Sequence, residues 1–322
     1  MLRSRNERLR LGVLPLSALL IATTGCFGGA ADRGAPTGTF TGTATFTLTF
    51  EGRVRNYELH VPATLNGAPA PLLIQLHGGG GNGQRINGLT RFAELGDRQG
   101  FVTVAPSGVD KGWNDGRSDL ATTAVDEQVD DVGFIAAVID QVASVFPIDR
   151  TRVYAVGISN GAMMTGRLAC ELSDRLAGVA MVAGTAAADA ASWCHPSRPV
   201  PMLQIHGTED PIVPYRGGTV KALGTQRGKV LGVDALAELW RSLDGATSAP
   251  TSTTMGPDVT VRGWGGPTPQ SDLVFYRVEG AGHTWPGGMQ YLPQFVIGST
   301  TNTFDATTTI WQFLSTHRLN TG

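Results

Sequence analysis

Six short, predominantly apolar runs recur along the chain, with segments of helical periodicity between them. They cover residues 72–76, 101–105, 153–156, 179–182, 202–205 and 273–278. A strand that is buried on both faces of a sheet reads as a continuous apolar run, whereas a half-buried strand alternates apolar and polar residues. Strands that alternate with helices favour a parallel sheet covered by helices on both faces. The pattern therefore predicts an α/β fold.

The predicted helices each have one apolar face. The clearest has apolar residues three and four positions apart, at Val132, Ile135, Ile139, Val142 and Phe146. Asp130 and Asp131 precede this face, where carboxylates favour the positive end of a helix, and Pro147 ends it. Further helices are predicted over residues 233–243 and after Asp305, a candidate N-cap.

Two segments before the first apolar run alternate small or aromatic residues with polar ones. They are residues 41–50 and 57–61, with a turn at residues 51–52 between them, and they predict an antiparallel pair. With the six runs, roughly eight strands form one mostly parallel sheet in a single domain of residues 41–322. Residues 245–270, rich in Gly, Pro, Ser and Thr, are interpreted as a surface excursion.

Composition excludes several classes of function. The chain has 322 residues, 41% of them hydrophobic and 16% charged, which suits a globular protein with a sizeable core. Its formal net charge of −2 provides no basic field that would attract nucleic acid. The 43 glycines follow no repeat period, so collagen-like and solenoid folds are excluded.

Residues 1–26 have the order of an export signal, which is a basic start, an apolar run and then small residues. The alternative is an N-terminal helix of the domain. Residues 23–26, TTGC, resemble the cleavage box of bacterial lipoproteins, although that pattern prefers Leu where Thr23 stands. We expect lipid on Cys26, a flexible tether over residues 27–40, and a protein in the periplasm or outside the cell. Membrane contact is expected only through this anchor.

The three cysteines are an odd number. If Cys26 carries lipid, Cys170 and Cys194 remain as a pair in an oxidising compartment. The sequence therefore predicts a disulfide between them. The alternative is two separate buried thiols.

Gly157-Ile158-Ser159-Asn160-Gly161 matches the pattern G-x-S-x-G. The pattern is short and arises by chance, so its setting matters. It follows the apolar run at 153–156 and precedes a helical stretch at 162–172, which is the strand, sharp turn and helix that a nucleophilic Ser requires. The alternative is an ordinary turn between a strand and a helix. Ser159 is the candidate nucleophile.

A Ser hydroxyl needs a general base, and the base needs an orienting acid. His283 follows the run at 273–278, where a fold of this type places its base. His206 ends a strand before Gly207, a position that we interpret as structural. Asp210 follows the run at 202–205 and is the preferred acid, with Glu209 as its rival. The order Ser, Asp, His is that of α/β-hydrolases.

A glycine-rich segment follows the first apolar run, at residues 77–83. Residues without side chains let backbone N–H groups approach a substrate oxygen, and we expect the N–H groups of Gly79 and Asn160 to form an oxyanion hole. The segment also matches G-x-G-x-x-G, a dinucleotide fingerprint. The acidic residue expected about 20 positions later is missing, with Thr103 near that place. No metal-ligand cluster is visible, so neither a cofactor nor a metal is expected.

Several blocks in order resemble the polyhydroxybutyrate depolymerase and feruloyl esterase group of secreted esterases. They are residues 57–62, 76–83, 112–114, 130–134, 157–163, 207–215 and 282–287. The resemblance covers most of the chain after Phe40 and implies an α/β-hydrolase fold with cofactor-free ester hydrolysis. Many members have Cys where Gly79 stands, so a disulfide at that point is not expected. No linker or binding domain follows before Gly322, so soluble esters are the expected substrates.

The predicted function is a serine esterase that acts through an acyl-enzyme on hydroxyalkanoate oligomers or hydroxycinnamoyl esters. Trp285 follows His283 by two positions, and Trp113 and Tyr215 are predicted on loops after strands, so these aromatic rings are expected to line the substrate pocket. The alternatives are an acetyl (xylan) esterase, a peptidase of the same fold, or a non-catalytic binding lipoprotein on a hydrolase scaffold.

Overall fold

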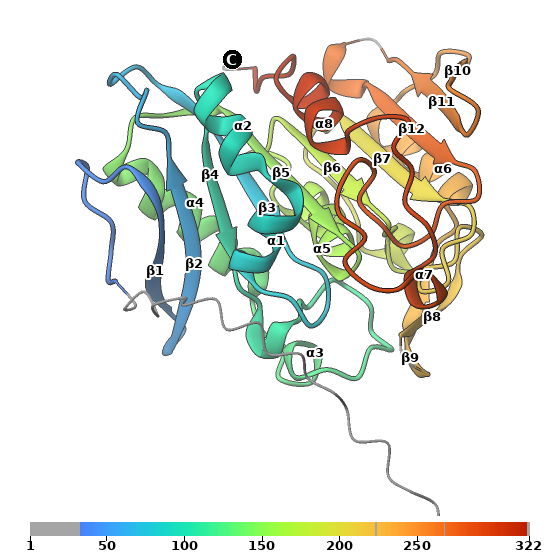
Figure 1. Ribbon diagram of the computed structural model, residues 1–322, viewed down its shortest axis with the longest axis horizontal. Helices are drawn as coiled ribbons and strands as arrows, with labels where there is room; N and C mark the ends of the chain where they lie inside the picture. The colour runs from blue at the N-terminus through green and yellow to red at the C-terminus, as the bar shows by residue number, and fades with distance from the viewer. Residues whose placement is uncertain (1–32, 223, 267, 321–322) are drawn as a thin grey trace, which may run out of the picture. The chain divides into compact units, whose positions relative to one another are not determined.

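The computed structural model describes residues 33–222, 224–266 and 268–320. Within them, the main sheet has ten strands, which Figure 1 shows in ribbon form. In spatial order they are β1 (Gly42–Phe50), β2 (Arg53–Val61), β4 (Val102–Pro106), β3 (Ala70–Leu76), β5 (Ile148–Ile158), β6 (Gly178–Val182), β7 (Met202–Gly207), β12 (Leu273–Val278), β11 (Val259–Trp264) and β10 (Thr251–Met255). The pairs from β4 through β12 are parallel, and the pairs outside them are antiparallel.

All eight strands expected from the sequence are present, and the expected antiparallel pair is β1 with β2. The prediction for residues 245–270 was wrong, because this segment contains β10 and β11, which extend the sheet beyond β12. Every residue of β10 is exposed, so its pairing leaves no buried apolar pattern in the sequence. A separate hairpin of β8 (Gly218–Ala222) and β9 (Thr225–Val230) was also missed.

Helices cover both faces of the sheet, as the alternation of strands and helices predicted. Buried residues of α4 (Asp131–Val145), α5 (Asn160–Glu171) and α6 (Val233–Asp244) belong to one apolar cluster. Those of α1 (Gly83–Thr90), α2 (Phe92–Gln99) and α8 (Ala306–Leu314) belong to a second cluster on the other face. Short α3 (Thr123–Asp126) and α7 (Gln294–Ile297) and the 3₁₀ turns η1 (Val109–Lys111), η2 (Ala190–Ser192) and η3 (Pro269–Ser271) lie in the connections.

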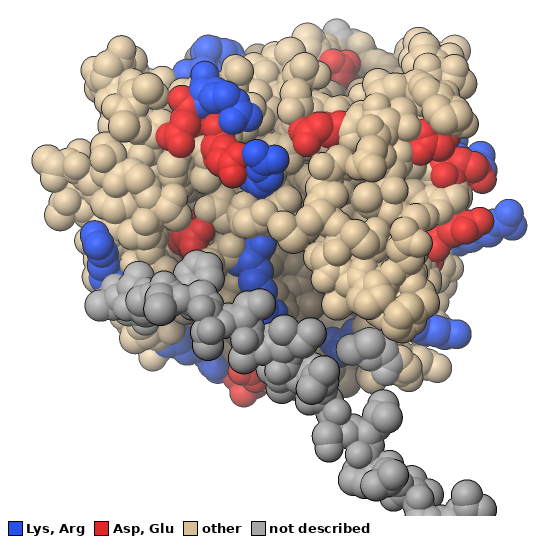
Figure 2. Space-filling model, in the orientation of Figure 1, with Lys and Arg blue, Asp and Glu red and all other residues tan. Residues whose placement is uncertain are grey.

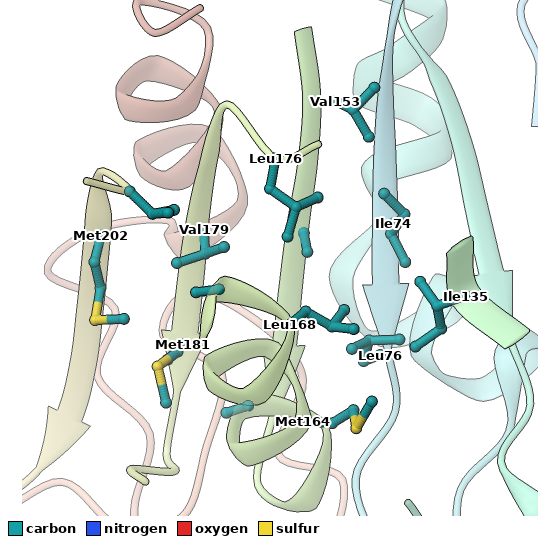
Figure 3. Packing of buried hydrophobic residues seen from close by; sticks show 14 of the residues in the cluster. Ile74, Leu76, Ile135, Val153, Met164, Leu168, Leu176, Val179, Met181 and Met202 are labelled. Atoms are coloured by element: carbon teal, nitrogen blue, oxygen red, sulfur yellow. The ribbon is translucent and has the colours of Figure 1, made fainter. Parts of the chain in front are cut away.

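Side chains of the central strands alternate between the two clusters. Figure 3 shows Ile74 and Leu76 of β3 on the same side as Met164 and Leu168 of α5. Leu73, which directly precedes Ile74, belongs to the second cluster. Because both faces are buried, the strand reads as a continuous apolar run.

Two predicted helix starts are confirmed. The Oδ1 atom of Asp130 accepts from the N–H of Gly133 at 2.8 Å, and Oδ1 of Asp305 accepts from the N–H of Thr308 at 2.7 Å. These bonds satisfy backbone donors that the first turn of a helix leaves unpaired.

The predicted export signal and Cys26 lie outside the described residues. Of the predicted tether, residues 33–40 are described, and they belong to the folded unit. Arg33 pairs with β1, since its carbonyl accepts from the N–H of Thr47 at 2.8 Å, and the ring of Phe40 packs on Phe46 with 5.0 Å between centroids. In the described ranges, none of the helices is both long and apolar enough to cross a membrane.

Candidate active site

Three predicted catalytic residues follow strands of the parallel part of the sheet. Ser159 comes directly after β5, Asp210 shortly after β7, and His283 after β12. In the sheet only β6 separates β5 from β7, and β7 pairs with β12. Because the carboxyl ends of parallel strands meet at one edge, the fold brings all three residues to the same edge.

Ser159 lies in a strained turn between β5 and α5. Its φ and ψ angles are 59° and −124°, a region that residues with a side chain rarely occupy. Its N–H donates to the carbonyl of Val182 at 3.0 Å. A Cβ on Gly157 would come within 2.2 Å of the carbonyl oxygen of Gly161, and one on Gly161 within 2.1 Å of that of Leu76. The two motif glycines therefore let α5 begin close against the sheet, as the motif requires.

The imidazole of His283 pairs with Asp210. Its Nδ1 atom lies 2.8 Å from Oδ2, and both side chains are buried. Because an ionised carboxylate only accepts, Nδ1 carries the proton and Nε2 is left as a proton acceptor. The other oxygen of Asp210 accepts from the N–H groups of Ile212 and Val213, at 2.8 Å each. Glu209, the rival acid in the sequence, is exposed.

A second buried histidine lies beside this carboxylate. The Nε2 atom of His206 is 3.4 Å from Oδ2 of Asp210 and 2.9 Å from the carbonyl oxygen of Val213. The side-chain amide nitrogen of Gln204 is 3.2 Å from Nδ1 of His206, so Nδ1 accepts and Nε2 carries the proton. Burial raises the pKa of Asp210, but His283 and His206 together bring that pKa well below its usual range. The candidate acid is therefore held ionised.

The glycine-rich segment after β3 runs beside the Ser159 turn. A Cβ on Gly78 would lie 3.2 Å from that of Ser159, and one on Gly79 would lie 3.9 Å from that of Asn160. Among the described residues, neither the N–H of Gly79 nor that of Asn160 donates to a protein acceptor. Asn160 also begins α5, where the helix dipole adds positive potential. Both amides are free to bind a substrate oxygen.

The side chain of Asn160 connects this region to the loop after η1. Its Oδ1 accepts from the N–H of Trp113 at 2.9 Å, and its Nδ2 donates to Asp115 at 2.5 Å. Asp115 in turn accepts from Arg117 at 2.6 to 3.1 Å, and both side chains are at most 3% exposed. Arg117 also donates to the carbonyl of Arg227 in β9. Sequence reasoning missed this pair, because two charges in a glycine-containing loop are typical of an exposed turn.

The chain is similar in sequence to known esterases. Residues 64–223 match the family described as phospholipase/carboxylesterase. NocK of Nocardia uniformis subsp. tsuyamanensis, provisionally named an esterase, is 31% identical over 280 residues, which are 82% of this chain and 80% of NocK. The chain belongs to the phospholipase/carboxylesterase family of α/β-hydrolases.

Two further likenesses agree with this assignment. Feruloyl esterase B of Piromyces equi is 30% identical over 193 residues, which are 58% of this chain but 35% of that relative. The structure of acetyl xylan esterase from Aspergillus awamori has a TM-score of 0.55 at 18% identity, covers 75% of this chain and 94% of its own, and supports the fold. The protein is a carboxylic ester hydrolase, and the predicted fold and likeness to feruloyl esterases are confirmed. The likeness to polyhydroxybutyrate depolymerases stays a prediction.

Two aromatic residues of this esterase do not line an open pocket, contrary to expectation. Trp113 is fully buried, and its indole N–H donates to the carbonyl of His77 at 2.9 Å. Trp285 is 1% exposed; its indole N–H donates to Thr307 at 3.0 Å and its ring packs edge-on against Phe92. Both rings pack against protein atoms beneath the segments that carry the site. Neither ring is exposed to a substrate in this structure.

Tyr215 of the esterase is half-buried beside the acid. Its ring packs edge-on against that of His206, with 5.8 Å between centroids, and the guanidinium of Arg277 lies 5.8 Å from its ring. Burial raises the pKa of Tyr215. A substrate contact for Tyr215 stays a prediction.

The predicted disulfide is confirmed. Cys170 and Cys194 are bonded, with their Cα atoms 5.0 Å apart. The bond joins the last turn of α5, the helix that Ser159 begins, to the segment after η2. The end of the nucleophile helix is thereby fixed covalently to a neighbouring loop.

A cavity of about 340 Å³ lies elsewhere in the esterase. Its lining includes residues 68–71 at the start of β3, Arg152 and Tyr154 of β5, and Trp311 of α8. This is the edge of the sheet opposite Ser159, so the cavity does not belong to the candidate site. In the part of the chain that the structure describes, no three His, Cys, Asp or Glu residues gather to hold a metal ion.

Proposed function

We propose that Ser159, His283 and Asp210 are the catalytic triad of this esterase. The observation that carries the proposal is the buried pair between Nδ1 of His283 and the ionised Asp210, 2.8 Å apart, at the sheet edge of the strained Ser159 turn. A carboxylate in this position holds the imidazole in the tautomer whose Nε2 accepts a proton. Among the described residues Ser159 and His283 share no hydrogen bond, and such contacts often tighten only with substrate in place.

The reaction proceeds in two acyl transfers. His283 takes the proton of Ser159, whose oxygen attacks the ester carbonyl carbon, and the carbonyl oxygen becomes an oxyanion. As the carbon–oxygen bond to the alcohol breaks, His283 returns the proton to the leaving alcohol. Water then attacks the acyl-enzyme by the same route and releases the acid. The N–H groups of Gly79 and Asn160 hold the oxyanion in both steps.

Replacing Ser159 by Ala tests the proposal. We expect turnover of p-nitrophenyl acetate to fall by roughly 10⁴ to 10⁶, because the members of a triad act as a unit. A fluorophosphonate probe should label the wild-type enzyme at Ser159 and leave the Ser159→Ala variant unlabelled. If the variant retains more than about a tenth of the wild-type activity while folding normally, Ser159 is not the nucleophile.

For the substrate we propose soluble esters of short or aromatic acids, namely hydroxyalkanoate oligomers or hydroxycinnamoyl esters. The support is the likeness to a feruloyl esterase over 58% of this chain. A panel of methyl ferulate, the methyl ester of the hydroxybutyrate dimer, acetylated xylan and p-nitrophenyl palmitate, compared by kcat/KM, tests the proposal. A preference for acetylated xylan would instead make the protein an acetyl esterase, and a preference for the palmitate would contradict the proposal.

We also propose that the protein is exported and anchored by lipid on Cys26. The support is the basic and apolar order of residues 1–22 followed by TTGC at 23–26. In cell fractionation the wild-type protein should sediment with membranes, and Cys26→Ser should be released. If the wild-type protein and the Cys26→Ser variant were both found in the soluble fraction, the proposal of a lipid anchor on Cys26 would be wrong.

A further inference from the structure

Large exposed apolar side chains are concentrated in one loop beside His283. In the described residues five such side chains are exposed, and three of them, Met289, Leu292 and Phe295, lie within seven positions. Phe295 is 90% exposed, Met289 62% and Leu292 44%. We refer to residues 287–297 as the apolar loop.

The segment around the apolar loop carries no charge. Residues 280–304 contain no Asp, Glu, Lys or Arg, although 16% of the chain is charged. Figure 2 shows uncharged side chains over the region where Figure 1 draws this loop and α7. Such a surface offers contact area to an uncharged apolar group and nothing to a charged one.

The apolar loop is bonded directly to the backbone of His283. The N–H of His283 donates to the carbonyl of Ile297 at 2.5 Å, and the hydroxyl of Tyr291 donates to the carbonyl of His283 at 2.7 Å. Of the two residues that make these bonds, Ile297 is buried and Tyr291 is half-buried. Two residues that flank Leu292 and Phe295 along the chain are therefore fixed to the backbone of the candidate base.

The direction of the proton transfer decides which half of an ester, the acyl half or the alcohol half, lies on the His283 side of the site. The carbonyl oxygen of the ester faces the N–H groups of Gly79 and Asn160. The leaving alcohol receives its proton from Nε2 of His283, so the alcohol half must lie on the His283 side of the site. The apolar loop is attached to that side.

We propose that the apolar loop binds the leaving alcohol of the ester and favours substrates whose alcohol half carries apolar groups and no charge. The proposal rests on the triad proposed above. Phe295 and Leu292 supply the contact area, and Tyr291 and Ile297 hold the loop at a fixed position relative to His283. Specificity for the alcohol half is thus set by this loop and not by the buried rings of Trp113 and Trp285.

Two ester series separate the alcohol half from the acyl half. In the first the acyl group is always acetyl, and the alcohol is methanol, hexanol or benzyl alcohol. In the second the alcohol is always methanol, and the acid is acetic, hexanoic or phenylacetic acid. The quantity compared is kcat/KM from acid release, because it reports the acylation step, in which the alcohol is still present.

Phe295→Ser and Leu292→Ser together should lower kcat/KM about tenfold for hexyl and benzyl acetate, because apolar area is no longer removed from water. Methyl acetate should change less than twofold, which also shows that the variant is folded. Val54→Ser is the matched control, since Val54 is 72% exposed on β2, and it should leave both series unchanged.

The other outcomes overturn the proposal. A loss confined to methyl hexanoate and methyl phenylacetate would assign the loop to the acyl half. An unchanged profile in both series would show that the loop does not contact substrate, while the triad proposal would stand. If the wild-type enzyme hydrolyses none of the esters, the proposed function itself fails.

Discussion

His206 and Asp210 meet inside the protein, with Nε2 of the imidazole 3.4 Å from the carboxylate oxygen that also accepts from His283. His206 and Gln204 point to the face of β7 on which Met202 joins the apolar cluster. Polar groups in such a place cost free energy unless they are hydrogen-bonded. Their arrangement keeps one more N–H directed at the carboxylate that orients the candidate base.

Replacing His206 should therefore weaken catalysis without changing substrate binding. For His206→Phe we expect kcat to fall about tenfold with KM nearly unchanged, because Asp210 loses a donor and orients His283 less firmly. His206→Gln offers an N–H in a similar place and should retain more activity. Active-site titration would correct kcat for the folded fraction. Equal kcat in the wild-type and His206→Phe enzymes would mean that this contact is without catalytic effect.

Asp115 should act on both stability and catalysis. Asp115→Ala leaves the charge of Arg117 buried without its carboxylate partner, which typically costs about 3–5 kcal/mol, and removes the shorter of the two hydrogen bonds that Nδ2 of Asn160 donates. We expect a marked fall in the melting temperature and in kcat.

A double variant separates the two effects. Asp115→Ala with Arg117→Met removes both charges and should recover most of the melting temperature. Its kcat should stay low, because the side chain of Asn160 still lacks its bond to Asp115 and is held only by the backbone of Trp113. Recovery of both quantities would show that Asp115 serves stability alone.

The disulfide should stabilise the fold with little effect on chemistry. Its cysteines are 24 positions apart, and closing a loop of this size is worth about 3 kcal/mol in the chain-entropy account. Cys170→Ser with Cys194→Ser should lower the midpoint of urea unfolding and leave kcat within about twofold at 25 °C. An unchanged midpoint would contradict the stabilising role.

The sequence predicted the parts of this protein whose physical cause is local. The apolar runs predicted the central strands because both faces of the sheet are buried, and Asp130 and Asp305 predicted helix starts because caps are local hydrogen bonds. Ser159 was predicted because a strained turn needs glycines at fixed offsets. The order of Ser159, Asp210 and His283 then followed from the fold class.

The sequence failed where long-range contacts decide a residue's role. Trp285 stands two positions after His283, but its ring turns inward to Thr307, more than twenty positions away along the chain. Asp115 gains its importance from Asn160, which is 45 positions away. The sequence did not predict β10, because its residues are all exposed and only its pairing with β11 makes it a strand. In each case the partner is distant along the chain, so the local sequence pattern around the residue does not predict the contact.

Stability should depend on pH through Asp244. Its Oδ1 accepts from the N–H of Val200 at 3.1 Å, and its Oδ2 has no hydrogen-bond partner in the described ranges. Burial raises the pKa of Asp244 to about 7, from its ordinary value of 3.8. Between these two values the folded protein keeps a proton that the unfolded chain has lost, so the free energy of unfolding falls as the pH rises through this window.

Asp244→Asn removes this group from the titration. The free energy of unfolding of the variant, measured by urea titration from pH 4 to pH 8, should lack this decline, so that the difference between variant and wild type increases with pH. A shift of about three pKa units corresponds to a change on the order of 4 kcal/mol across the window, and the increase should level off above about pH 7. Other titrating groups are common to both proteins and cancel in the difference. A difference that stays constant with pH would show that Asp244 has the same pKa in the folded and the unfolded chain, with the half-buried Arg198 guanidinium then compensating its charge.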